Sequence, residues 1–250
     1  MRLSLTAIVM ACALALVTQA QAQTVFTDNF ESHSAGNSII GTNGWYEQGR
    51  QGNASDPLVI ASVPGLSGQA GDGNAVTGDP GSSFVAIAND AGLAGGADPV
   101  QDNVLSWKWL VNRDMPTGST GFGLLGTRTS MAIVRNQSTS QEGWELNVSD
   151  TLDTDNRYAL PQGGGVEQVL DLRIVFNSSD TQFFMNGQLL QTSPSNGGSG
   201  QFANINGIRW GINNDPNIGA GFIDDIVVQL PEPTSLGLLA LGGLMMWRRR

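Results

Sequence analysis

Apolar and polar residues alternate with a period of two along much of this chain, which is the pattern of half-buried β-strands. Leu105, Trp107 and Trp109 alternate with polar side chains, although Leu110 interrupts the polar side. Residues 170–176 repeat the same alternation. These two stretches predict long strands that each bury one face.

Further strands are expected along the rest of the chain. Asn186-Gly187 lies between two apolar runs and predicts a two-residue hairpin, because both residues accept a positive φ. The other predicted strands are residues 25–30, 58–63, 83–88, 121–125, 131–135, 144–148, 182–185, 188–191, 208–212 and 221–228. Three Gly-rich or polar stretches, 65–81, 91–99 and 193–200, are expected to be surface loops. About a dozen strands without a helical period predict an all-β fold, a jelly-roll β-sandwich.

The first residues form a separate segment with the parts of a secretory signal peptide. A short basic start precedes an apolar run, and Ala20-Gln21-Ala22 fits the small-x-small rule for cleavage. We therefore predict a signal peptide over residues 1–22 and a mature chain that begins at Gln23. A lipoprotein signal at Cys12 and an uncleaved anchor are the weaker alternatives.

The last twenty residues form a second segment outside the expected domain, which spans residues 23–230. An apolar run over 236–247 would be about 18 Å long as a helix, shorter than the roughly 30 Å of a bilayer core. This length favours a processed signal over a permanent transmembrane helix, and the basic end favours retention on the cytoplasmic side. A core or amphipathic helix is disfavoured because the run has no polar face.

This second segment, residues 231–250, resembles the sorting signal of the PEP-CTERM family of exported bacterial proteins. The matching residues are Pro231, Glu232, Pro233, Arg248, Arg249 and Arg250. The resemblance implies that an exosortase and the secretion machinery are partners. It also implies a Gram-negative bacterium that makes exopolysaccharide, and hence a role in a biofilm. We expect export through the inner membrane to the cell surface or extracellular matrix, with membrane contact only through the end segments.

Composition narrows the possible functions of the domain. The chain has a net charge of -10, so nucleic acid and anionic lipid are expected to be repelled. Cys12 is its only cysteine and lies in the predicted signal peptide. The mature domain therefore has neither a disulfide nor a catalytic thiol.

Three short motifs resemble the concanavalin A-like or laminin G-like β-sandwiches. They are Phe26-x-Asp28-x-Phe30-Glu31, Phe184-x-Asn186-Gly187-x-Leu189 and Phe222-Ile223-Asp224-Asp225-Ile226. The resemblance implies a sandwich fold that binds glycans in many members and hydrolyses them in others. Related sandwiches often hold a structural calcium ion.

Carboxylates near the two ends of the domain are candidate calcium ligands. Asp28 and Glu31 belong to the first predicted strand, and Asp224 and Asp225 to the last. If the terminal strands of the sandwich lie side by side, their oxygens would gather, and calcium takes 6–8 oxygen ligands. Alternatively, Asp28 caps a turn and the Asp224–Asp225 pair faces solvent.

Aromatic residues in loops are candidates for stacking against sugars. Trp45 and Tyr46 lie in a Gly-rich stretch, and Tyr158 follows an acidic turn. A core position is an equally good interpretation for Trp45. The other tryptophans of the domain lie in strand patterns and are expected in the core.

No catalytic constellation is recognised. Glu142 and Glu145 are three residues apart and would point to opposite faces of a strand, so they cannot flank one glycosidic bond. Glu145 shares a face with Asn147, which is expected to be solvated. His33, the only histidine, lies in a turn-like stretch and is expected to be exposed.

Together these patterns predict a non-enzymatic exported protein that adheres to extracellular polysaccharide, with calcium as a candidate structural cofactor. A structural matrix protein without a specific ligand is the first alternative. A sandwich-type enzyme that acts on glycans is the second.

Overall fold

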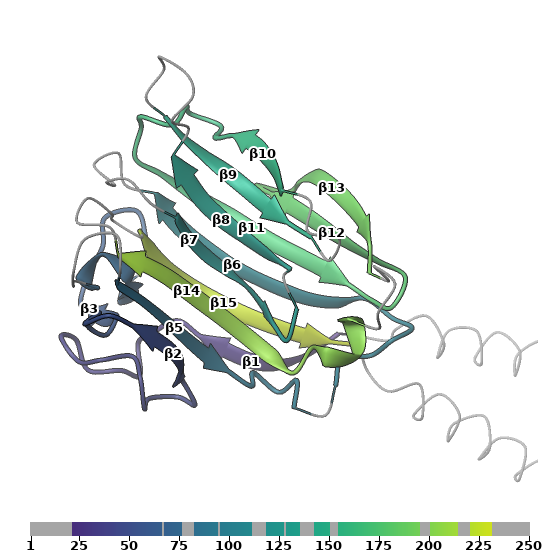
Figure 1. Cartoon of the computed structure of the whole chain (residues 1–250), viewed down its shortest axis with the longest axis horizontal. Helices are drawn as coiled ribbons and strands as arrows, with labels where there is room; N and C mark the ends of the chain where they lie inside the picture. Colours follow the sequence, from purple (N-terminus) through teal and green to yellow (C-terminus); the bar gives the residue numbers. More distant parts are fainter. Residues whose placement is uncertain are drawn as a thin grey trace, which may run out of the picture.

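The computed structural model describes residues 22–66, 68–76, 83–94, 96–111, 119–127, 129–135, 143–150, 155–195, 201–214 and 221–231. These residues form two antiparallel β-sheets that overlie each other (Figure 1). The predicted all-β sandwich is therefore confirmed. Two short 3-10 helices, η1 (Gly73–Ala75) and η2 (Gln201–Asn204), accompany the strands.

The first sheet has eight strands. In order across the sheet they are β13 (Gln188–Pro194), β12 (Asp180–Met185), β11 (Gln168–Phe176), β6 (Asn103–Val111), β15 (Phe222–Leu230), β4 (Ala70–Asp72) and β3 (Leu58–Ile60), and β1 (Gln23–Asp28) also pairs with β15. The first and last strands of the domain are thus hydrogen-bonded neighbours, as expected, with Gln23 opposite Leu230.

The second sheet has seven strands. In order they are β10 (Asp155–Ala159), β9 (Trp144–Ser149), β8 (Ser130–Arg135), β7 (Ser119–Leu125), β14 (Gly207–Asn214), β5 (Ser83–Asn89) and β2 (Tyr46–Gln51). Side chains of β10 and β13 join the two sheets at one edge, because Asn156 donates a hydrogen bond to Gln191 at 2.8 Å.

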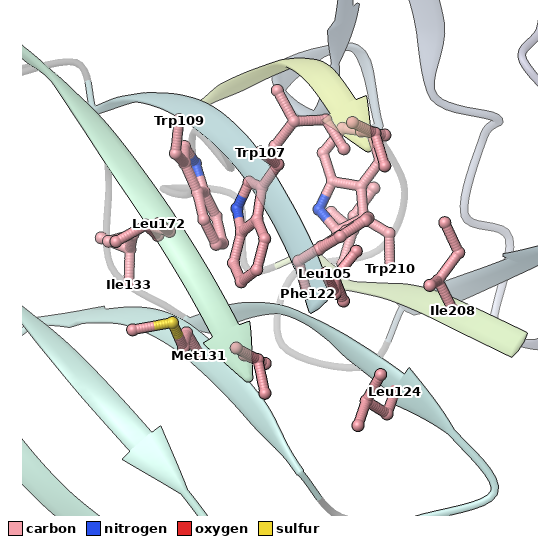
Figure 2. Packing of buried hydrophobic residues seen from close by; sticks show 14 of the residues in the cluster. Leu105, Trp107, Trp109, Phe122, Leu124, Met131, Ile133, Leu172, Ile208 and Trp210 are labelled. Carbon is pink, nitrogen blue, oxygen red and sulfur yellow. The ribbon is translucent and has the colours of Figure 1, made fainter. Parts of the chain in front are cut away.

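Large apolar side chains from both sheets meet between the layers (Figure 2). The rings of Trp107 from β6 and Phe122 from β7 lie 4.8 Å apart. Trp109, Trp144 and Trp210 are buried as well, as their strand patterns predicted. The aromatic rings contribute both buried area and oriented ring contacts to the core.

The local details of the longest strands follow the sequence pattern. Asn186 and Gly187 have φ angles of 50° and 78°, so the predicted hairpin between β12 and β13 is present. Leu110, which interrupts the polar side of β6, is buried with Val63 and Ala70 in a small separate cluster. The segment between β3 and β4, which contains Val63, therefore covers Leu110 on the outer face of the eight-stranded sheet.

Three strands were missed in stretches that the sequence marks as loops. β2 and β10 are edge strands with few apolar residues, so they lack the alternation of a half-buried strand. β4 lies within the predicted loop over 65–81 and is only three residues long.

The two end segments lie almost wholly outside the described residues. Of the predicted signal peptide only Ala22 is described, and of the predicted sorting signal only Pro231. Within the part of the chain that the structure describes, no helix has the length and apolarity to cross a bilayer.

Candidate functional site

Asp28, a predicted calcium ligand, is buried and holds the start of the domain together. One carboxylate oxygen, Oδ1, accepts hydrogen bonds from the backbone N–H of Phe30 at 2.9 Å and lies 3.1 Å from His33 Nε2. The other, Oδ2, accepts a hydrogen bond from Trp45 Nε1 at 2.8 Å. Both oxygens are therefore engaged within the protein, and the turn-capping alternative describes Asp28 better than calcium ligation.

The sequence prediction that His33 is exposed is wrong, because the structure buries this residue. Its side chain is 1% exposed and lies between the Asp28 carboxylate and the Thr42 hydroxyl, which is 2.8 Å from Nδ1. The turn after β1 folds back over the core, so a polar stretch in sequence became a buried hydrogen-bond network.

Asp224 is fully buried and only partly satisfied. Its Oδ1 accepts a hydrogen bond from the backbone N–H of Asp225, but its Oδ2 has no hydrogen-bond partner. The pKa of Asp224 is raised to about 6, chiefly by burial, with smaller contributions from the charges of Asp225 and Glu31; the backbone hydrogen bond from Asp225 and the charge of Lys108 oppose the rise.

The other two predicted calcium ligands have partners nearby. Asp225 forms an ion pair with Lys108 at 2.7 Å, and Glu31 Oε1 accepts a hydrogen bond from the backbone N–H of Gln69. Among the described residues, which include all four predicted ligands, no group of three or more acidic, histidine or cysteine side chains is arranged to hold a metal. A calcium site therefore stays a prediction, now centred on the unpartnered oxygen of Asp224.

The three aromatic candidates do not share one surface. Trp45 is 2% exposed and belongs to the core, the alternative that the sequence left open. Tyr46 is 40% exposed on β2, whereas Tyr158 lies on β10 at the opposite edge of the same sheet. The hydroxyl of Tyr158 lies 3.1 Å from Gln191 Oε1, so this side chain contributes to the contact between β10 and β13.

Only one of the two glutamates considered as a catalytic pair, Glu145, is among the described residues. Glu142 lies outside the described residues, and Glu145 lies 3.8 Å from Arg157 on the neighbouring strand. Glu145 does share a face with Asn147, as predicted, but Asn147 is 9% exposed rather than solvated.

A depression of about 300 Å³ lies on the outer face of the seven-stranded sheet. It is outside the sandwich because its lining residues alternate with core residues such as Phe122 and Trp210 along β7 and β14. The lining residues are Phe84, Gly121, Gly123, Leu124, Thr127, Thr129, Ser130, Ala132, Val134, Asn147, Ser149, Arg209 and Gly211. We call it the glycine-floored depression.

The floor is low because small residues line up across neighbouring strands. Gly211 on β14 is opposite Gly121 on β7, Gly121 is opposite Ala132 on β8, and Ala132 is opposite Asn147 on β9. With about 4.8 Å between strands, the row from Gly211 to Asn147 is roughly 14 Å long. Gly211, Gly121 and Ala132, on three adjacent strands, are therefore partly exposed and carry no side chain larger than a methyl group.

Packing does not demand glycine at every floor position. A Cβ atom at Gly121 would meet no atom closer than 3.7 Å, and one at Gly211 would be 3.4 Å from the Phe84 ring. A Cβ atom at Gly123 would lie 2.2 Å from the carbonyl oxygen of Thr129, so only this glycine is required by the fold. Glycine weakens a strand interior, and packing does not explain its presence at positions 121 and 211. The effect of these two glycines is to leave the floor of the depression without side chains.

Asn147 brings an unsatisfied polar group to the end of this row. Its side-chain Nδ2 donates a long hydrogen bond to Ser149 at 3.4 Å, whereas its Oδ1 is buried and has no partner within the described part of the chain. An unpartnered buried acceptor costs about 1–3 kcal/mol. Asn147 lines the depression, so a ligand there that donates a hydrogen bond would recover this free energy once the amide, now closed off from solvent, turns toward it.

Part of this site can be seen in the sequence, in the alternation of glycine with apolar residues over 121–124. Gly121 and Gly123 alternate with Phe122 and Leu124, so two successive positions on one face of that strand have no side chain. What no single stretch reveals is the register that sets this bare face beside Gly211.

No protein-family model and no curated protein matches this chain, but solved structures share its fold. A carbohydrate esterase from the Shiga toxin-encoding bacteriophage phi24B is 14% identical, with a TM-score of 0.55 over 85% of this chain and 100% of that chain. The T. cruzi calreticulin globular domain is 12% identical, with a TM-score of 0.49 over 87% and 92%. Domain 4 of a GH43 extracellular arabinanase from Geobacillus stearothermophilus, in complex with arabinotriose, is 14% identical, with a TM-score of 0.45 over 84% and 94%. At 14% identity the likeness to the esterase concerns the fold alone, and the other two, with TM-scores below 0.5, support no conclusion about this chain.

Proposed function

We propose that the protein binds glycans in the glycine-floored depression and does not transform them. The observation that carries the proposal is the row from Gly211 to Asn147, where glycines that packing does not require lie beside an unpartnered amide oxygen. Sugar hydroxyls both donate and accept hydrogen bonds, so a ring lying on this floor would supply the donor that Asn147 lacks.

The rest of the lining combines hydroxyl groups with an aromatic ring. Hydroxyl groups of Thr129 and Ser130 border the floor on one side, and the Phe84 ring borders Gly211 on another. An apolar ring with a few convergent polar groups is the usual composition of a small-molecule site. The phage protein with the same fold is a carbohydrate esterase, which supports the proposal of a carbohydrate ligand. We also propose that the sandwich is of the concanavalin A-like jelly-roll type.

Binding without turnover is proposed from the composition of the lining. The described residues that line the depression include no aspartate, glutamate, histidine or cysteine. Hydrolysis of a glycoside with retention needs two carboxylates about 5–5.5 Å apart. The described part of the lining therefore offers groups that would hold a ligand, and no carboxylate, imidazole or thiol that would transfer a proton.

We further propose that the protein acts outside the cell, on the cell surface or in a polysaccharide matrix. This part rests on the predicted signal peptide and on the PEP-CTERM-like end segment, with an exosortase as the processing partner. Calcium is retained as a candidate structural ion at Asp224, whose Oδ2 has no hydrogen-bond partner, with Glu31 as a candidate second ligand.

Replacing Gly121 by leucine tests the location of the site. The first side-chain atom fits without overlap, and the remaining atoms would fill the depression. We expect Gly121→Leu to abolish binding on a glycan array while the melting temperature stays close to that of the native protein. Gly165→Leu is the matched control, because Gly165 is exposed and a Cβ atom there meets nothing within 4 Å.

Three outcomes would count against the proposal. If the native protein binds no glycan with or without calcium, the structural-matrix alternative is favoured. If Gly121→Leu binds as tightly as Gly165→Leu, the binding surface lies elsewhere. Release of products from a bound polysaccharide would instead favour the enzyme alternative.

A further inference from the structure

Arg209 is the cationic side chain of the glycine-floored depression. It lies on β14 opposite Gly123 of β7 and Ala88 of β5, two cross-strand neighbours without polar side chains. Its side chain is half-buried and lines the depression. The guanidinium group therefore borders the open floor on the side away from Asn147.

Arg209 differs from the other cationic side chains that the structure describes. Arg50 pairs with Glu47 and Asp56, Lys108 with Asp225, and Arg157 with Glu145, while the guanidinium of Arg173 lies 4.2 Å from the centre of the Phe184 ring. Within the described part of the chain Arg209 has neither an ion pair nor a ring contact. It is thus an unpaired cation in a protein whose net charge is -10.

Arg209 is apart from the carboxylates that the structure describes, so its charge is available to a ligand. Guanidinium presents two parallel N–H donors that match a carboxylate, and such charge-assisted pairs are stronger than neutral hydrogen bonds. Gly123, directly opposite Arg209, is buried, but Gly121 on the same face of β7 is partly exposed and has no side chain that would keep a ligand away from Arg209. An extended ligand can therefore contact Arg209 and Asn147 at the same time.

We propose that the glycan bound in the depression is an acidic polysaccharide whose sugar carboxylate pairs with Arg209, while a neighbouring hydroxyl donates to Asn147 Oδ1. This inference rests on the proposed function and names the ligand class of the same site. The overall negative charge does not prevent such binding, because repulsion between separated charges is screened beyond about 10 Å at 0.1 M salt, whereas a contact pair is screened much less.

The test compares acidic polysaccharides with their own neutral forms. Affinities of the purified full-length protein for polygalacturonate and alginate would be measured at 0.15 M salt by calorimetry, beside the same polymers after reduction of their carboxyl groups. We expect the native protein to bind the acidic forms at least about tenfold more tightly than the reduced forms, as the loss of one charge-assisted pair implies.

Two variants locate this preference. Arg209→Gln should lose the preference but keep binding to the reduced polymers, and Arg209→Lys, which keeps the charge without the fork, should retain part of it. Arg173→Gln is the matched control, because Arg173 is an arginine on the outer face of the other sheet and should leave both affinities unchanged.

The outcomes separate this inference from the proposed function. Equal affinity for acidic and reduced polymers, with no effect of Arg209→Gln, would overturn the acidic ligand and leave glycan binding intact. A stronger, Arg209-dependent preference for dextran sulfate over both carboxylated polymers would also overturn it, in favour of a sulfated glycan. Failure to bind any of these polymers would overturn the acidic ligand, and it would overturn the proposed function as well only if the native protein also binds no glycan on the array.

Discussion

Two buried aspartates in this sandwich have opposite environments. Asp28 is surrounded by donors from Phe30, His33 and Trp45, so its charge is compensated inside the protein. Asp224 accepts one backbone hydrogen bond and leaves Oδ2 without a partner. A buried charge that is only partly compensated is costly, and this difference makes Asp224 the residue whose ionisation should affect stability.

Stability should fall as the pH rises through the pKa of Asp224. Burial raises that pKa from 3.8 to about 6 in the folded state, so the folded protein binds a proton that the unfolded chain has already released. The corresponding stability is fully present below about pH 4 and is lost as the pH rises through about 6. In excess chelator, Asp224→Asn should remove this loss and make the protein more stable than the native form at pH 7.5, by about 1–3 kcal/mol at 1.4 kcal/mol per pKa unit. Urea unfolding at pH 4.5 and 7.5 measures both effects, and a variant less stable than the native protein at pH 7.5 would contradict this assignment.

The same variant tests the calcium proposal. Calcium bound at Asp224 would compensate its charge, so calcium should raise the melting temperature of the native protein at pH 7.5 and leave Asp224→Asn unchanged. An unchanged melt of the native protein in calcium, relative to chelator, would rule out the ion.

At the scale of a single strand, β7 combines two kinds of glycine. Gly123 is forced by the backbone of the turn into β8, where the Thr129 carbonyl also accepts a hydrogen bond from Leu124 N–H at 2.9 Å. Gly121, two residues earlier on the same face, has room for a side chain. Packing therefore requires glycine at position 123 but not at position 121.

Alanine substitutions should separate these two glycines. Gly123→Ala would drive a Cβ atom into the Thr129 carbonyl and should destabilise the protein by more than about 2 kcal/mol, whereas Gly121→Ala should be neutral or stabilise it by up to about 1 kcal/mol. Denaturant midpoints measure both. Equal losses in the two variants would show that Gly121 is also held by packing, and its link to the depression would weaken.

How far the sequence predicts this fold depends on how each strand is buried. β6 and β11 are central strands with one core face, so alternation marks them clearly. β2 and β10 pair on one side only and carry mostly polar residues, so their pattern is that of a loop. The depression was beyond prediction because it depends on register: Gly211 and Gly121 are ninety positions apart in sequence but directly opposite in the sheet.

At the scale of the whole molecule, the sandwich places its ends and its candidate site on different sheets. Gln23 and Leu230 pair in the eight-stranded sheet, where the predicted leader and sorting segments would join the domain. The glycine-floored depression lies on the outer face of the seven-stranded sheet. A domain attached through its ends would therefore keep this outer face available to a polysaccharide.

The most direct test of glycan binding in the depression is to map a bound oligosaccharide by chemical-shift perturbation of the isotope-labelled protein. The largest shifts should occur at the backbone amides of Gly121, Gly123 and Gly211 and at the side-chain amide of Asn147, with little change at Tyr158. Shifts concentrated around Tyr158, or none at saturating oligosaccharide, would contradict the proposed site.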